Sequence, residues 1–300
     1  MIRPSCLLSL LIALALSSSA AAQTPDPAAP SNTTARSIAD PQIDLNLISL
    51  PTTQSVKRHH GYFRLNHRFA RDLRLGTFGD LAADLFALDN GAVLGLEYRF
   101  GLTDSLHGGV HRSTEAKTLQ VFGRWDTIRQ GDRFPVGASA VVSTEGLDNL
   151  QEARQPALGA VFSRTWGQRL AVYASPTYVD GTYHAALVAA NVDGHGHGHG
   201  DASQELPDVV VGDLDNRTFF VGLGTRVRIR PSVFAVGEYS PRLSGYAPGD
   251  PMWGLALEKW TRGHTLALTL TNSFATTPGQ IARGGTPSAL YVGFNITRKF

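Results

Sequence analysis

What the sequence lacks narrows the choice of fold. Cys6 is the only cysteine, and it lies in a segment that we expect to be cleaved, so the mature chain has no disulfide and no thiolate metal site. Beyond residue 22, no apolar run reaches the roughly 20 residues that a membrane-spanning helix needs. With 27 basic and 25 acidic residues, the chain also lacks the basic excess of a nucleic-acid-binding protein. These absences leave a soluble protein or a closed β-barrel in a membrane.

The first residues predict export. Arg3 supplies a positive charge, Leu7–Leu16 forms a short apolar core, and Ala20–Ala22 offers a small-residue cleavage site. This is the pattern of a secretory signal peptide, which we expect to cover residues 1–22.

The rest of the chain divides into a lead and one domain. Residues 23–57 are rich in Pro, Ala and Ser and have no sustained periodicity, so we expect a flexible N-terminal lead. Within the lead, residues 43–47 form a short apolar alternation that could dock somewhere. Residues 58–300 have a uniform texture and are predicted to form a single domain.

Alternation of apolar and polar residues predicts membrane β-strands, because neighbouring side chains of such strands face lipid and lumen in turn. The clearest example ends the chain, where one face carries Leu290, Val292, Phe294 and Ile296 and the other carries Tyr291, Gly293, Asn295 and Thr297. The same pattern predicts about twelve strands, with ten to fourteen as the range: 62–69, 92–100, 105–113, 116–125, 135–143, 156–166, 169–179, 216–229, 232–240, 252–260, 264–274 and 288–300.

The connections between these strands alternate in length. Bacterial membrane barrels have short periplasmic turns and longer outer loops. With both termini in the periplasm, the predicted outer connections include the long stretches 70–90 and 180–215, whereas the predicted periplasmic ones include the pairs 167–168 and 230–231. This rhythm favours an all-β fold, a transmembrane antiparallel up-and-down barrel. A soluble β-sandwich is the alternative.

Two sets of residues resemble known bacterial barrels. The stretch 291–300 resembles the C-terminal signal that the barrel assembly machinery reads, with Phe294, Ile296 and Phe300 as its apolar positions, although Arg298 departs from it. The stretches 64–69, 84–92 and 101–104 are similar to an uncharacterised family of outer-membrane β-barrel proteins with a domain of unknown function. The resemblance implies a location in the outer membrane, with lipid and the assembly machinery as partners. It implies no catalytic residue and no cofactor.

The predicted register points a set of charged and imidazole side chains into the barrel. These lumen-lining candidates are Arg64, Arg68, Glu97, Arg99, His107, His111, Arg226, Arg228, Glu238 and Glu258. In a barrel narrower than the 16- to 18-stranded porins, such groups line a small channel or fill it with ion pairs. Both interpretations stay open.

Two further clusters each have a structural and a functional interpretation. His195, His197 and His199 alternate with glycine in the longest predicted outer loop, which suits either a low-complexity insertion or a site for a transition-metal ion. Asp80 and Asp84 lie on a predicted short helix over 78–89. Two such carboxylates solvate a helix or bind a divalent cation.

The sequence favours a non-enzymatic role without a cofactor. It contains no nucleophile elbow, phosphate loop or zinc-protease motif. We therefore expect an outer-membrane barrel that forms a narrow passive channel or an outer-surface binding scaffold for a small solute. The alternatives are a lipid-modifying barrel enzyme and a soluble periplasmic or secreted β-protein with a binding role.

Overall fold

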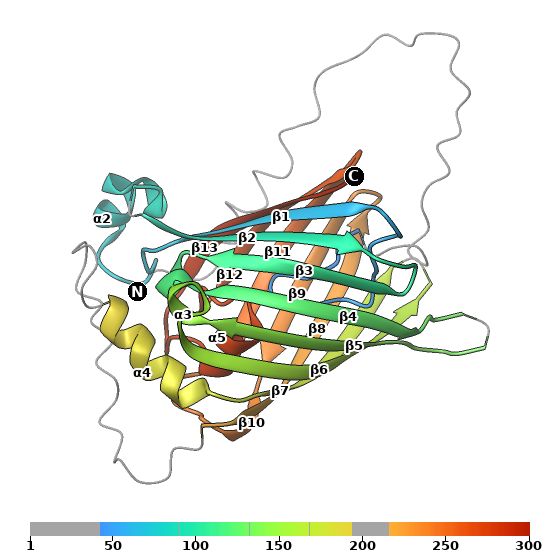
Figure 1. The fold of residues 1–300 in the computed structure, drawn as a ribbon. Coiled ribbons are helices and arrows are strands. Elements are labelled where there is room, and N and C mark those ends of the chain that lie inside the picture. The colour runs from blue at the N-terminus through green and yellow to red at the C-terminus, as the bar shows by residue number, and fades with distance from the viewer. Residues whose placement is uncertain (1–42, 90, 132, 168, 194–215) are drawn as a thin grey trace, which may run out of the picture. The chain divides into compact units, whose positions relative to one another are not determined.

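Twelve antiparallel strands close into a ring. The computed structural model describes residues 43–89, 91–131, 133–167, 169–193 and 216–300, all within one compact unit. The chain runs around the ring in order, because each strand pairs with the next one of the ring and β1 pairs with β13 (Figure 1). The strands of the ring are β1 (Gly61–Phe69), β2 (Ala92–Gly101), β3 (Leu106–Ser113), β4 (Leu119–Ile128), β5 (Gly137–Gly146), β6 (Glu152–Trp166), β7 (Leu170–Val179), β8 (Thr218–Arg230), β9 (Val233–Ser240), β11 (Met252–Thr261), β12 (His264–Thr271) and β13 (Tyr291–Lys299). The predicted barrel and strand number are confirmed.

One further strand lies outside the ring. β10 (Arg242–Gly245) pairs with the first residues of β8, beyond the point where β8 begins to pair with β9. The sequence predicted only an outer loop over residues 241–251. Four residues are too short for a period-two pattern to stand out from loop composition.

The two faces of the strands differ in chemistry as predicted. On β4, Val121 and Trp125 are exposed on the outer face, whereas Gln120 and Arg124 are buried on the inner face. Other strands repeat this alternation, so an apolar band surrounds a polar interior. Among the described residues, none of the helices is long and apolar enough to cross a bilayer.

Helical segments gather at one end of the barrel (Figure 1). They occupy odd-numbered connections, which include the long ones between β1 and β2, between β7 and β8 and between β12 and β13, so the loop-length rule makes this the outer end. The segments are α2 (Phe78–Ala83), η1 (Leu85–Ala87), η2 (Glu115–Lys117), α3 (Leu147–Leu150), α4 (Thr182–Asp193) and α5 (Pro278–Arg283).

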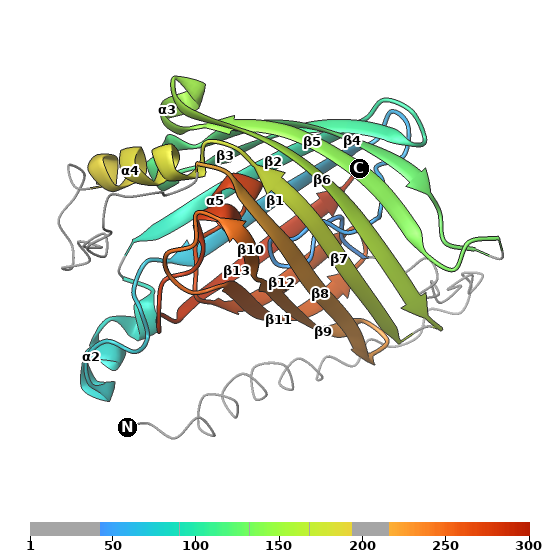
Figure 2. The same ribbon diagram turned by 90° about the horizontal axis from the view of Figure 1, so that it is seen from below.

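Helix α5 folds into the outer mouth of the barrel (Figure 2). Thr277 caps it by accepting from the backbone N–H of Gln280, and Pro278 at the first turn suits the helix start. The carboxylate of Glu145 on β5 accepts from Thr277 Oγ1 at 2.7 Å and from Gly279 N at 3.0 Å. The last outer loop is therefore tied to the opposite wall and covers part of the mouth.

The predicted flexible lead needs a correction. Residues 43–56 were assigned to it, yet they lie inside the ring, as the blue segment before β1 shows in both views (Figures 1 and 2). Leu45, Leu47, Ile48 and Leu50 are almost fully buried. The barrel interior removes their apolar surface from water, whereas a flexible lead would leave that surface exposed. Residues 1–42, including the predicted signal peptide, lie outside the described residues.

Candidate functional site: a hairpin inside the barrel

Residues 45–52 form a tight hairpin, here called the lumen hairpin. The backbone N–H of Thr52 donates to Leu45 O at 2.9 Å, and that of Leu47 donates to Leu50 O at 2.8 Å. An antiparallel bridge joins residues 46 and 51. The tip, residues 48–50, is thus presented to the wall by a short two-stranded stem.

Both ends of the segment leave at the periplasmic end of the barrel. Before the hairpin, Ile43 O accepts from Thr265 Oγ1 near the start of β12. After it, Gln54 Oε1 accepts from Lys299 Nζ at the end of β13. The tip reaches the outer loops, because Ser49 Oγ donates to the backbone oxygen of residue 275 at 2.8 Å. The lumen hairpin therefore runs through most of the barrel's depth.

The carboxylate of Glu238 on β9 holds the tip. It accepts from three consecutive backbone N–H groups, those of Ile48 at 2.7 Å, Ser49 at 2.9 Å and Leu50 at 2.8 Å. Successive N–H groups of a turn form a concavity suited to an anion. Hydrogen bonds to an ionised acceptor are about twice as strong as neutral ones. Glu238 is thus the main polar anchor of the tip.

Guanidinium groups bind the carbonyl oxygens of the hairpin. Arg64 Nη2 on β1 donates to Leu47 O at 3.0 Å and to Ile48 O at 2.6 Å. Arg226 Nη2 on β8 donates to Asn46 O at 3.0 Å. The wall thus satisfies backbone groups that the hairpin's own stem leaves unpaired, which a buried backbone requires.

Ion pairs within the wall hold two of the arginines in place. Arg226 makes a bidentate contact with Glu258 on β11, at 2.8 and 3.0 Å. Arg99 pairs with Glu97 on the same strand at 2.6 Å, and its Nη2 donates to Asn46 Oδ1 at 2.8 Å. These pairs compensate each other's charge inside the barrel. Both ion pairs join two wall residues and so form without the hairpin, although each arginine also donates to Asn46.

Three inward glycines receive the aliphatic side chains of the hairpin. A Cβ at Gly222 would lie 2.4 Å from Leu50 Cδ2, and one at Gly224 would lie 2.2 Å from Leu47 Cδ1. A Cβ at Gly254 on β11 would lie 3.0 Å from Ile48 Cδ1 at the hairpin tip. We call Gly222, Gly224 and Gly254 the glycine sockets. A side chain at any of these positions would take the space that the hairpin's aliphatic side chains occupy, so those side chains would have to move.

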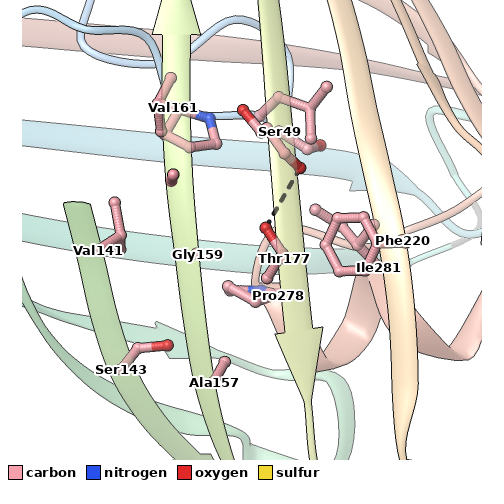
Figure 3. A pocket seen from close by; sticks show the side chains of 14 residues that line it. Ser49, Val141, Ser143, Ala157, Gly159, Val161, Thr177, Phe220, Pro278 and Ile281 are labelled. Carbon is pink, nitrogen blue, oxygen red and sulfur yellow. Dashed lines mark hydrogen bonds between the residues drawn. The ribbon is translucent and has the colours of Figure 1, made fainter. Parts of the chain in front are cut away.

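A cavity remains between the hairpin and the wall of β5, β6 and β7 (Figure 3). Its volume is about 50 Å³, which is room for one or two water molecules. Ser143, Gly159 and Thr177 line it from the wall, and Leu50 lines it from the hairpin. This arc of the wall carries small side chains, which leave this space beside the hairpin.

The structure places nine of the ten lumen candidates as buried groups on the inner face; Arg228 is only half-buried. It lies near the periplasmic end with its guanidinium 5.3 Å from the ring centre of Phe234. Six candidates surround the hairpin or its ion pairs, namely Arg64, Glu97, Arg99, Arg226, Glu238 and Glu258. Arg68 instead donates to Asn295 Oδ1 at 2.8 Å. The rings of His107 and His111 have no hydrogen-bond partner among the described residues.

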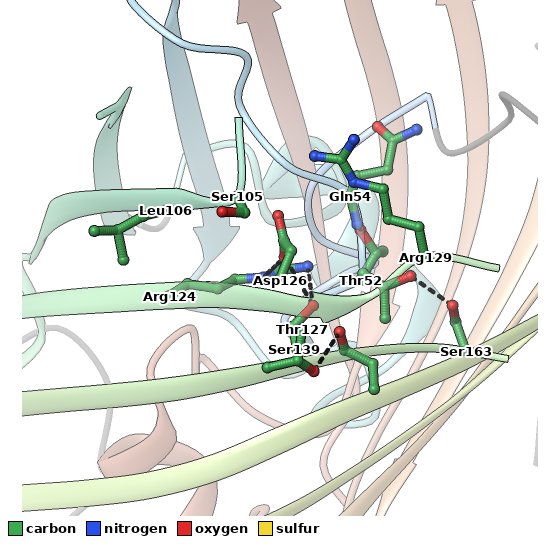
Figure 4. Close-up of polar contacts among 12 residues, drawn as sticks. Thr52, Gln54, Ser105, Leu106, Arg124, Asp126, Thr127, Arg129, Ser139 and Ser163 are labelled. Carbon is green, nitrogen blue, oxygen red and sulfur yellow. Dashed lines mark hydrogen bonds and ion pairs between the residues drawn. The ribbon is translucent and has the colours of Figure 1, made fainter. Parts of the chain in front are cut away.

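Sequence reasoning missed a second polar cluster (Figure 4). Arg124 Nε lies 3.0 Å from Asp126 Oδ1, and Ser139 Oγ on β5 donates to the same oxygen at 2.8 Å. The predicted strand ended at residue 125 and so excluded Asp126. The inward alternation of residues 120, 122, 124 and 126 was the signal that extends it. The glycine sockets were missed because glycine also serves turns and close strand contacts.

The two acidic residues of the first outer loop have structural roles. Asp80 completes a capping box with Thr77 at the start of α2. Hydrogen bonds from the backbone and hydroxyl of Thr77 hold the pKa of the Asp80 carboxyl below its usual value. Asp84 pairs with Arg71. Within the described part of the chain, these carboxylates belong to no cluster of three or more potential metal ligands, and His195, His197 and His199 lie outside the described residues.

The residues of the predicted assembly signal lie on the outer face of β13 or just after it. Phe294 and Ile296 point outward, and the backbone of Phe300 exchanges two hydrogen bonds with Gly61, at 2.8 and 3.0 Å. Phe300 thus closes the ring against β1. Its role as a signal to the assembly machinery stays a prediction.

A family profile for a membrane-bound beta barrel domain (DUF5777) matches residues 44–300. The chain belongs to this family. The match begins inside the lumen hairpin's segment, so the family domain includes the hairpin. The prediction of an uncharacterised outer-membrane barrel family is confirmed, as is the location in the outer membrane.

Solved structures of outer-membrane channels are similar to this family member in outline. A KdgM porin in complex with disordered oligogalacturonate has a TM-score of 0.48 at 6% identity, covering 80% of this chain and 99% of its own. The NanC porin has a TM-score of 0.47 at 9% sequence identity, and the match covers 80% of this chain and 98% of that porin. An outer-membrane channel from Pseudomonas putida F1 has a TM-score of 0.45 at 12% sequence identity, and the match covers 82% of this chain and 97% of that channel. A search of the curated proteins finds no significant match.

Proposed function

We propose that this outer-membrane barrel is a narrow passive channel for a small solute, and that the lumen hairpin is its gate. The observation that carries the proposal is the route of the hairpin. Ile43 and Gln54 both lie at the periplasmic end, so the hairpin can withdraw into the periplasm without threading through the barrel. Its contacts to the wall are hydrogen bonds and van der Waals contacts, which break and form again.

The wall is built to persist without the hairpin. Arg226 keeps its bidentate partner Glu258, and Arg124 keeps Asp126, so these inner charges stay compensated, whereas Glu238 and Arg64 lose their hairpin partners. The glycine sockets and the small side chains of β5–β7 would then line an open path. A ring of twelve strands leaves a lumen narrower than that of the 16- to 18-stranded porins, which suits a small solute.

Planar-bilayer conductance tests the gate. We expect the full mature chain to be closed most of the time and a deletion of residues 44–56 to conduct steadily. The matched control is a deletion of equal length in the lead, residues 24–36, which should behave as the full chain does. The retarded migration of unboiled protein on a gel shows that each barrel has folded. Equal conductance of folded full-length and hairpin-deleted barrels would overturn the proposal.

The proposal involves no catalytic step and no cofactor. Its support is that the inward polar groups around the hairpin are engaged by peptide backbone or by each other. The rival function is a barrel enzyme that acts on lipids. Phospholipase and deacylase assays on the folded, hairpin-deleted barrel should give no turnover; turnover by this variant would favour the enzyme.

A further inference from the structure

The wall around the lumen hairpin recognises two features of a peptide. It binds backbone groups, because Glu238 accepts three consecutive N–H donors and Arg64 donates to two carbonyl oxygens. It also binds aliphatic side chains, because the glycine sockets fit Leu47, residue 48 and Leu50. The wall is thus complementary to the backbone and the aliphatic side chains of a peptide turn.

The charges of the wall support this interpretation. Among the described residues, neither Glu238 nor Arg64 has an ion-pair partner; Arg64 otherwise donates only to Asn66 Oδ1. Ion pairs such as Arg226–Glu258 need no ligand, whereas these two groups are satisfied by the hairpin backbone. Once the hairpin leaves, a buried carboxylate and a buried guanidinium need new donors and acceptors.

We propose that the lumen site binds short aliphatic peptides in place of the lumen hairpin, which acts as a built-in competitor for it. The inference rests on the proposed function, since the hairpin must leave before a peptide can bind. A peptide supplies N–H groups to Glu238, carbonyl oxygens to Arg64 and Arg226, and leucine or isoleucine side chains to the glycine sockets. The solute of the channel is then an apolar oligopeptide.

The first test uses the hairpin-deleted barrel and a synthetic peptide of residues 44–52, Asp-Leu-Asn-Leu-Ile-Ser-Leu-Pro-Thr. We expect saturable binding by calorimetry and a reversible block of the current. The control peptide carries Leu47→Asp and Leu50→Asp and should do neither. Where the deletion fails to fold, the full chain with the same two substitutions replaces it, because carboxylates cannot enter the apolar sockets.

The second test changes the wall. Gly222→Val with Gly224→Val should weaken binding of the peptide about tenfold or more, because side chains fill the sockets. Gly237→Val is the matched control: it faces lipid on β9 and a Cβ there meets nothing nearer than 3.6 Å, so affinity should not change. Glu238→Gln should weaken binding of the peptide as well.

The outcomes separate the two proposals. If the hairpin-deleted barrel conducts but neither binds the peptide nor is blocked by it, the peptide site is refuted and the gate stands. If the peptide binds but deletion leaves conductance unchanged, the gate is refuted. Free leucine that binds as tightly as the peptide, or socket variants that bind it unchanged, would also overturn the peptide site.

Discussion

At the residue scale, two opposite charges determine how the lumen is occupied. Glu238 and Arg64 are buried on the inner face and face the same hairpin tip, one through its N–H groups and the other through its oxygens. A charge buried without partners is costly. The lumen hairpin removes that cost for both, which is why it binds the wall so closely.

The substitution Glu238→Gln tests this anchor. All three N–H groups donate to Oε1, so the amide oxygen can still accept from them, but the substitution removes the negative charge that strengthens these hydrogen bonds. It also places an NH2 group where Oε2 accepts from Ser49 N–H. We expect docking of the hairpin to weaken by about 1–3 kcal/mol, or about 5- to 150-fold in the ratio of docked to undocked states. Single-channel recording should show more frequent openings. Glu152→Gln, at an exposed site on β6, is the control, and equal open times in the two variants would contradict the role of Glu238.

A second residue-scale prediction concerns the lipid-facing band. Val142 and Thr144 both lie exposed on the outer face of β5, two residues apart. Val142→Arg places a charge nearer the bilayer centre and should lower the free energy of unfolding by about 2–4 kcal/mol, whereas Thr144→Arg, nearer the interface, should cost about 0–1 kcal/mol. Urea titration in phospholipid bilayers measures both. An equal loss would mean that the band is misplaced.

At the element scale, the strands were predictable and the segments that fill the barrel were not. The strands have a two-residue period that the sequence displays directly, because one face contacts lipid along the whole length. The lumen hairpin has too short an alternation, residues 43–47, to be distinguished from a lead. Its burial depends on the glycine sockets of β8 and β11, which lie far along the chain and which no local pattern reveals.

Helix α5 illustrates the same limit. Its capping box at Thr277 is visible locally, but its place in the outer mouth depends on Glu145 across the barrel. Thr277→Ala removes both the cap and that contact, and we expect a loss of about 0.5–2 kcal/mol in local stability. Hydrogen exchange of residues 278–283 measures it. Thr77→Ala, the same change in the capping box of α2, should leave the exchange of α5 unaltered, and an effect of equal size would point to global destabilisation.

At the scale of the whole molecule, the barrel is a membrane scaffold around a peptide segment of its own chain. The family match extends into that segment, and the wall supplies its polar partners and its apolar sockets. The inward direction of the candidate residues was predictable from strand register. Their partners were not, because the predicted alternatives, a water-filled channel or a network of ion pairs, both left out a peptide in the lumen.

The gating claim is tested most directly by a reversible lock between hairpin and wall. A Cβ at position 222 would lie 3.2 Å from Leu50 Cγ, the place that a sulfur at residue 50 would take, so Leu50→Cys with Gly222→Cys should form a disulfide. We expect single-channel recordings of this variant to be silent when oxidised and to show openings after reduction. Steady conductance with the disulfide formed would contradict a gate in the lumen. So would a reduced variant that stays silent, if the hairpin-deleted barrel is silent too.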